Sequence, residues 1–261
     1  MGRQEKHIFI AIPTTSGTGS EVTTYSVITS GKRKIPLSEE EMLPDIAILN
    51  PDFIKTLPPK VIADTGMDVL THAIEAYVCK KTNLFIKTLA IGAIKTVFSD
   101  LVNNYENPEL ERERTDLQIA SCMAGIAFSN ASLGVNHSIA HALGARFHIA
   151  HGRLNAMLMP KVILFNSKNK RAAELYSEIA RELGFIPRNA KEGAELLAKA
   201  IEIRNFKMKI PGRLKDMGVS EKEYFKQINS MILQIEEDKC TEHNPRRFTR
   251  IEMAEFLRSI Y

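Results

Sequence analysis

The chain has 261 residues, of which 44% are hydrophobic and 25% are charged, and its formal net charge is +4. This composition excludes general disorder, and the length is sufficient for a core that needs no disulfides. No run of Lys and Arg is long and no apolar stretch approaches the roughly 18 residues of a membrane span, so we expect neither a nucleic-acid nor a membrane partner. The three scattered cysteines indicate a reducing compartment, and we expect the protein to be cytoplasmic.

The opening part of the chain predicts short strands joined by turns. Residues 7–13 are expected to form a buried strand, and the loop TTSGTGSE (14–21) follows it. Alternation of β-branched residues predicts a strand over 22–29, then a turn at 31–34 and a further short strand within 44–53. Two interpretations of the loop stay open, a nucleotide-holding loop and a tight turn, because it lacks the glycine pattern of known phosphate-binding loops.

From about Leu57 the pattern changes to helical periodicity. Two prolines open a helix over 58–80, in which apolar residues recur at helical spacing. Two or three helices are expected between 220 and 261. Others are expected at 88–105, 116–134, 136–147, 155–168, 171–184 and 190–209. The sequence therefore predicts a small β-rich opening followed by a long helical part.

Asp68 and His72 are the first candidate site residues. Their i,i+4 spacing places a carboxylate and an imidazole on one helical face, where they can share a metal ion. An isolated pair of this kind is more often a helix ion pair or a capping aspartate beside a solvated histidine. The apolar flanks argue against a solvated face here.

Four of the seven histidines, His137, His141, His148 and His151, fall within fifteen residues. His137 and His141 are again spaced i,i+4, and a loop after Gly144 would return His151 to the same site. Two or three histidines with one carboxylate suit Fe(II) or Zn(II) better than Mg²⁺ or Ca²⁺, which prefer oxygen ligands. We expect at least one of the four to have a structural role instead.

No other catalytic signature competes with these residues. The sequence has no G-x-S-x-G elbow and no C-x-x-C pair. Cys240 and His243 occur together in DKCTEHNPR (238–246), and we interpret this pair as structural.

Taken together, four segments resemble the iron-containing (group III) alcohol dehydrogenases. They follow the family's order: PTTSGTGSEVT (13–23), TGMDVLTHAIEAYV (65–78), GVNHSIAHALGARFHIAHG (134–152) and CTEHNPR (240–246). They look most like the propanol, ethanolamine-pathway and bifunctional aldehyde–alcohol dehydrogenases. The resemblance implies a mainly α fold: a helical metal-binding domain of the dehydroquinate synthase-like type over 58–261, preceded at 1–57 by the last part of an α/β dinucleotide-binding domain.

The resemblance also implies the site residues and their ligands. His141 stands beside substrate and cofactor and is the expected catalytic residue, whereas His148 matches a variable position. The iron-ligand positions are Asp68, His72, His137 and His151, and the cofactor-contacting positions are Thr14, Thr15, Thr23 and Lys34. The implied metal is Fe(II), with Zn(II) as the alternative, and the implied cofactor is NAD, with NADP as the alternative. The expected substrate is a small primary alcohol or aldehyde, and the expected assembly is a homodimer or larger.

The sequence departs from the family in two respects. It contains neither the G-G-G-S pyrophosphate loop nor the aspartate that reads the ribose, so we expect a gene fragment, a frameshift product or one half of a split enzyme. Arg153 adds a cation beside the expected ligand His151. Three functions stay open: an alcohol dehydrogenase with little turnover unless a separately encoded N-terminal half is supplied, a metal-binding remnant without turnover, and a partner-binding module of a complex such as a bacterial microcompartment.

Overall fold

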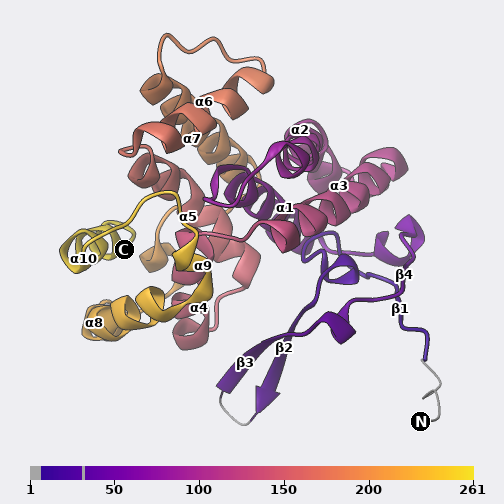
Figure 1. Ribbon diagram of the computed structural model, residues 1–261, viewed down its shortest axis with the longest axis horizontal. Coiled ribbons are helices and arrows are strands. Elements are labelled where there is room, and N and C mark those ends of the chain that lie inside the picture. The colour runs from indigo at the N-terminus through magenta and orange to yellow at the C-terminus, as the bar shows by residue number, and fades with distance from the viewer. Residues whose placement is uncertain (1–6, 31–32) are drawn as a thin grey trace.

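The chain folds around one buried helix, α1 (Pro59–Val78), which lies in the middle of the molecule (Figure 1). A computed structural model describes residues 7–30 and 33–261, and the side chains of residues 27–38 lie outside that description. Pro59 occupies the first position of α1, where its fixed φ favours the helix and its missing N–H is not needed. Every residue of α1 from Gly66 to Val78 is buried, so polar side chains on this stretch need partners inside the protein.

The helical body contains two apolar cores, and one helix contributes side chains to both. The larger core joins α1 to α2 (Leu84–Glu106), α3 (Glu111–Asn130), α6 (Lys170–Glu182) and α7 (Ala190–Lys207). The second core is built from α4 (Val135–Phe147), α8 (Glu221–Glu237) and α10 (Arg250–Ser259). Helix α5 (His151–Asn166) contributes side chains to both cores and therefore connects them.

Short helical elements occur in both parts of the chain. Helix α9 (Lys239–Glu242) follows α8 directly, and 3-10 turns occur at Ser20–Val22, Glu40–Met42, Pro51–Ile54 and Leu214–Met217. Asparagine side chains accept a backbone N–H at the starts of α2, α6 and α7, and Thr249 forms a capping box with Glu252 at the start of α10. None of the helices in the described part of the chain is both long and apolar enough to span a bilayer.

The N-terminal segment, residues 7–57, forms two separate pairs of strands. Strand β1 (Ile10–Ala11) pairs in parallel with β4 (Ile46–Ala47), with Ile10 opposite Ile46. Strands β2 (Tyr25–Ser30) and β3 (Arg33–Ser38) form an antiparallel hairpin that projects from the helical body (Figure 1). Because β1 and β4 are two residues long and have no further neighbour in the described sheet, they pair through few backbone bonds.

The mainly helical fold is confirmed, and each long helix predicted from periodicity exists. The strand predicted at 7–13 is present only at Ile10–Ala11, and the prediction that it is buried is wrong, because Ile10 is 48% exposed. The turn predicted at 31–34 is wrong at Arg33 and Lys34, which begin β3, while residues 31–32 lie outside the described residues. The predicted strand within 44–53 is limited to β4, because the 3-10 turn Pro51–Ile54 follows it.

Candidate metal centre

Four of the predicted site residues meet at one place in the helical body. Asp68 and His72 project from successive turns of α1, His137 lies in the first turn of α4, and His151 is the first residue of α5. The Nε2 atoms of His137 and His151 lie 3.8 and 3.7 Å from Asp68 Oδ1. The rings of His72 and His137 stack at 4.7 Å between centroids. Residues far apart in the sequence are thus brought into one cluster by three helices.

The donor atoms of this cluster fit a divalent metal ion. Metal bonds of about 2.0–2.2 Å at tetrahedral angles place ligand atoms roughly 3.4 Å apart, close to the separations from Asp68. One ligand atom each of Asp68, His72 and His137 lies within 4.8 Å of the others. Nδ1 of His72 is buried and has no hydrogen-bond partner within the described residues, although the Gly17 backbone hydrogen bonds with the same ring. One carboxylate and three imidazoles suit Fe(II) or Zn(II) better than Mg²⁺ or Ca²⁺.

Asn155 of α5 was not predicted from the sequence, and its side-chain amide lies among three of the site residues. Its Nδ2 lies 2.7 Å from Asp68 Oδ1 and 3.1 Å from Nε2 of both His137 and His151. The amide has two N–H groups, so it can donate to two of these three atoms at a time. A carboxylate oxygen and two imidazole nitrogens thus converge on one point, as the ligands of a cation do.

Glu75 was not predicted from the sequence either, although it lies about one turn after His72 on α1. Its Oε2 is 2.5 Å from Nδ1 of His137 and its Oε1 accepts the Asn136 N–H at 2.8 Å. Burial raises the pKa of Glu75 to about 8, and the backbone N–H groups of Asn136, Gly134 and His137 partly oppose this. The hydrogen bond holds the ring of His137 with Nε2 toward Asp68, as carboxylates do behind metal-bound histidines.

Burial keeps the histidine ligands in the form that binds metals. The pKa of His72 is lowered mainly by burial, and the pKa of His137 is lowered well below its ordinary value by burial and by the neighbouring histidines. Both rings are therefore neutral near neutral pH, with a lone pair available for a cation.

Helix α5 begins at His151, earlier than the residue 155 predicted from the sequence, and Gly152 lies in its first turn. A Cβ at Gly152 would lie 2.0 Å from the Asp64 carbonyl oxygen of α1, so only glycine lets the two helices approach so closely. This approach sets His151 against Asp68. The predicted loop is short, because residues 148–150 alone separate α4 from α5, and His148 ends α4 with φ of 53°.

Arg153 does not add an unpaired cation to the centre. Its Nε donates to Asp64 Oδ1 at 2.9 Å, and both side chains are largely buried. Burial raises the pKa of Asp64, and the hydrogen bond and charge of Arg153 act against that rise. The pair neutralises the cation behind His151, so the departure noted in the sequence is compensated within α1 and α5.

The predicted catalytic residue His141 lies at the open edge of the cluster. Its ring stacks on that of His151 at 5.3 Å, its side chain is 41% exposed, and its Nδ1 donates to Asp238 Oδ2 at 2.8 Å. Burial raises the pKa of Asp238, but hydrogen bonds from His141 and Cys240 outweigh it and hold that pKa below its ordinary value. The carboxylate therefore fixes Nδ1–H of His141 and leaves Nε2 free for a proton.

Among the described residues, the predicted cofactor residues do not form one cluster as the predicted metal ligands do. Thr14 is exposed and Thr15 is partly buried in the loop 14–21, whereas Thr23 is buried at the end of the Ser20–Val22 turn. Lys34 lies in β3, and its side chain lies outside the described part of the chain. The hydrogen bond between Gly17 and His72 joins this loop to the metal cluster, so the loop borders the centre.

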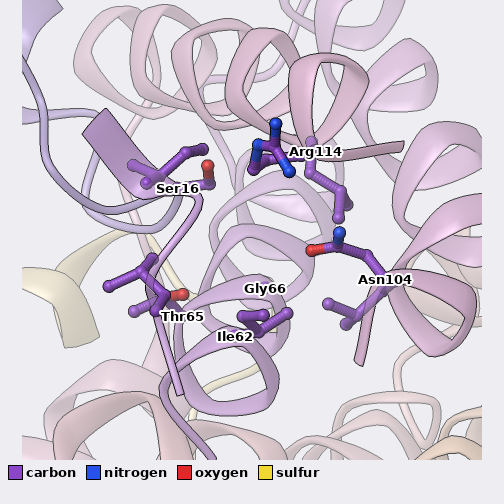
Figure 2. A pocket seen from close by; sticks show the side chains of 10 residues that line it. Ser16, Ile62, Thr65, Gly66, Asn104 and Arg114 are labelled. Carbon is purple, nitrogen blue, oxygen red and sulfur yellow. The ribbon is translucent and has the colours of Figure 1, made fainter. Parts of the chain in front are cut away.

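A small cavity of about 10 Å³ lies under the same loop (Figure 2). The side chains of Ser16, Asn104 and Arg114 approach it from three sides, and Gly66 forms part of its floor. Arg114 donates to the carbonyls of Pro51 and Pro108, at 3.0 and 2.9 Å. The volume is sufficient for about one water molecule, so this cavity is no site for an alcohol or a nucleotide.

Comparison with known proteins follows the same division of the chain. A sequence profile described as "Fe-containing alcohol dehydrogenase family, C-terminal" matches residues 62–261, and one described as "Iron-containing alcohol dehydrogenase" matches residues 2–51. The chain is 41% identical over 260 residues to an NADPH-dependent butanol dehydrogenase of Clostridium saccharobutylicum, covering 99% of the chain and 66% of that protein. It is also 41% identical to an aldehyde-alcohol dehydrogenase of Streptococcus pneumoniae, covering 100% of the chain and 31% of that protein.

Solved structures agree with these matches. An iron-containing alcohol dehydrogenase from Thermococcus thioreducens superposes with a TM-score of 0.89 at 38% identity, covering 97% of this chain and 64% of that one. A sulfoacetaldehyde reductase from Bifidobacterium kashiwanohense in complex with NAD⁺ superposes with a TM-score of 0.85 at 30% identity, covering 96% and 64%. The chain thus spans about two thirds of the butanol dehydrogenase and of both solved chains, and about a third of the aldehyde-alcohol dehydrogenase.

Proposed function

The chain belongs to the iron-containing alcohol dehydrogenase family, and from that premise we propose that it interconverts a small primary alcohol and its aldehyde with a nicotinamide cofactor. The observation that carries the proposal is the cluster of Asp68, His72, His137 and His151, whose donor atoms face one another in the helical body. We propose Fe(II) as its ion, with Zn(II) as the alternative, because the cluster offers one carboxylate and three imidazoles.

We propose a separate role for the metal ligands, for the residues that orient them and for the residue that moves the proton. A divalent ion held by these four residues would lower the pKa of an alcohol oxygen or polarise an aldehyde carbonyl. Glu75 and Asn155 orient the ligand rings, since each hydrogen bonds to a different nitrogen of His137. His141 is proposed to move the hydroxyl proton toward solvent, because Asp238 holds its Nδ1–H and its side chain is partly exposed.

The nicotinamide cofactor carries the hydride, and the protein supplies its position. We propose NAD or NADP as this cofactor. The butanol dehydrogenase is named for NADPH and the sulfoacetaldehyde reductase was solved with NAD⁺. The proposed contacts, Thr14, Thr15, Thr23 and Lys34, all lie in the N-terminal segment. Because the 261 residues contain no G-G-G-S pyrophosphate loop, we expect weak cofactor binding and slow turnover when this chain is assayed alone.

The test separates alcohol binding from turnover. The chain is loaded with Co²⁺, whose visible spectrum responds to a change of ligand, and titrated with 1-butanol or 1-propanol. We expect a saturable spectral change that is lost in His151→Ala and kept in His148→Ala. NADH formation is then measured with and without an added N-terminal α/β domain of a relative, which we expect to raise the rate.

Absence of both the spectral change and NADH formation, in a chain that holds its metal, would contradict the proposal. That outcome would favour the alternative of a metal-binding or partner-binding protein without turnover.

A further inference from the structure

A second group of metal-binding side chains lies next to the first. Asp238 caps the short helix α9 and accepts the Cys240 N–H at 2.9 Å, while its other carboxylate oxygen accepts Nδ1–H of His141 at 2.8 Å. One ligand atom each of His141, Asp238 and Cys240 lies within 4.8 Å of the others. The α4 histidine is thus joined to a carboxylate and a thiol that lie two residues apart at the start of α9.

We propose that His141, Asp238 and Cys240 form a second cation site, suited to a thiophilic divalent ion such as Zn²⁺. The donor set of one imidazole, one carboxylate and one thiolate is typical of zinc and unsuited to Mg²⁺ or Ca²⁺. Three protein ligands leave a fourth position for water. The sequence suggested a structural role for Cys240 with His243; this proposal groups Cys240 with Asp238 instead, because its thiol hydrogen bonds with that carboxylate.

The geometry requires only a small movement. Ligands of one tetrahedral zinc ion lie roughly 3.4 Å apart, so the 2.8 Å contact between His141 and Asp238 must open by about half an ångström. The side chain of His141 is 41% exposed and can make this movement, whereas that of Asp238 is 16% exposed and is held by Ser138 and by the Cys240 backbone. The anchored carboxylate and the movable imidazole make a site that closes around an ion.

The charges of the site balance when an ion binds. Burial and the carboxylates of Asp238 and Glu75 raise the pKa of the Cys240 thiol well above its ordinary value, so without an ion the thiol is protonated and hydrogen bonds with Asp238. Binding of Zn²⁺ releases the thiol proton to solvent, and the proton on His141 moves from Nδ1 to Nε2, so the imidazole stays neutral. The ion, one thiolate and one carboxylate then sum to zero charge, which limits repulsion from a cation in the neighbouring cluster.

An ion at this second site would occupy the imidazole that we propose moves the hydroxyl proton. Thiophilic ions would then inhibit the reaction without displacing the ion of the first cluster. The existence of the site does not depend on that reaction and can be tested by binding alone.

The test is a titration of the metal-free 261-residue chain with Co²⁺, followed by ultraviolet absorption. A thiolate bound to Co²⁺ gives a near-ultraviolet charge-transfer band, and the first cluster contains no thiol. We expect the first equivalent to bind without this band and the second to produce it. Zn²⁺ should then remove the band, because it binds such sites more tightly than Co²⁺.

Three variants test whether Cys240 is the source of the charge-transfer band. Cys240→Ser should lose the band and one equivalent of Co²⁺, whereas the matched control Cys122→Ser, with a half-buried cysteine on α3, should keep both. His151→Ala should weaken the first equivalent and keep the band, which also shows that the α9 region is folded. The proposal is overturned if the unaltered chain gives no thiolate band with excess Co²⁺, or if the band persists in Cys240→Ser.

Discussion

Helix α1 and the strand pair β1–β4 contain similar apolar residues but bury them to very different extents. Ile74 of α1 is fully buried, whereas Ile10 of β1 and Ile46 of β4 are 48% and 46% exposed. All four proposed metal ligands lie in the helical body, and the loop of the N-terminal segment is joined to them by the hydrogen bond between Gly17 and His72. The proposed metal ligands and the proposed cofactor contacts therefore lie in parts of the chain with very different packing.

A matched pair of truncations tests this difference at the level of stability. Ile74→Ala should reduce the free energy of unfolding by about 2–5 kcal/mol, because it leaves a cavity in the larger core. Ile10→Ala should cost less than about 1 kcal/mol, since half of that side chain already contacts water. Urea unfolding of both variants measures the two values. Equal losses would show that β1 is packed as tightly as α1.

The close approach of α5 to α1 provides the next test. Gly152→Ala should destabilise the chain by about 1–3 kcal/mol and weaken metal binding, because the added Cβ would meet the Asp64 carbonyl and push His151 away from Asp68. Gly212→Ala is the control, since a Cβ there has no neighbour within 4 Å. Urea unfolding and metal content are measured for both. A Gly152→Ala chain with unchanged metal content would refute this account of how His151 is placed.

A smaller effect on metal binding is expected from Glu75, which hydrogen bonds with the proposed ligand His137 and is not itself a proposed ligand. Glu75→Gln should weaken metal binding about 10- to 100-fold, because an amide in place of the carboxyl group holds Nδ1 of His137 less firmly. Competition with a chelator measures the affinity. Glu174→Gln, an exposed position on α6, should leave the affinity unchanged. Equal affinities in the two variants would remove Glu75 from the centre.

The sequence allowed most of the helical body to be predicted, and for a physical reason. Apolar residues recurred at helical spacing wherever a helix packs on a core, so the first long helix was expected at 58–80 and observed at Pro59–Val78. Histidine and aspartate stand out at i,i+4, and the structure brings those four residues together. Strand β3 was missed because its first residues, Arg33 and Lys34, resemble a polar turn.

The residues that surround the ligands could not be found in the same way. Glu75 sits in an apolar stretch of α1, where its charge was the only signal, and its partner His137 is 62 residues away. Asn155 and Asp238 acquire their roles only when α4, α5 and α9 meet, which no local pattern records. Gly152 was noted as a neighbour of His151, but the contact that requires glycine is with the backbone of another helix.

The most direct test of the central claim is the metal content of two histidine variants, prepared side by side and dialysed against a weak chelator after loading with Fe(II). His151 lies in the cluster and His148, three residues earlier, ends α4 with an exposed side chain. We predict that His148→Ala keeps about one tightly held ion per chain, as the unaltered chain does, and that His151→Ala loses nearly all of it, because the remaining residues cannot replace the missing bond. Equal metal content in the two variants would contradict the assignment of the centre.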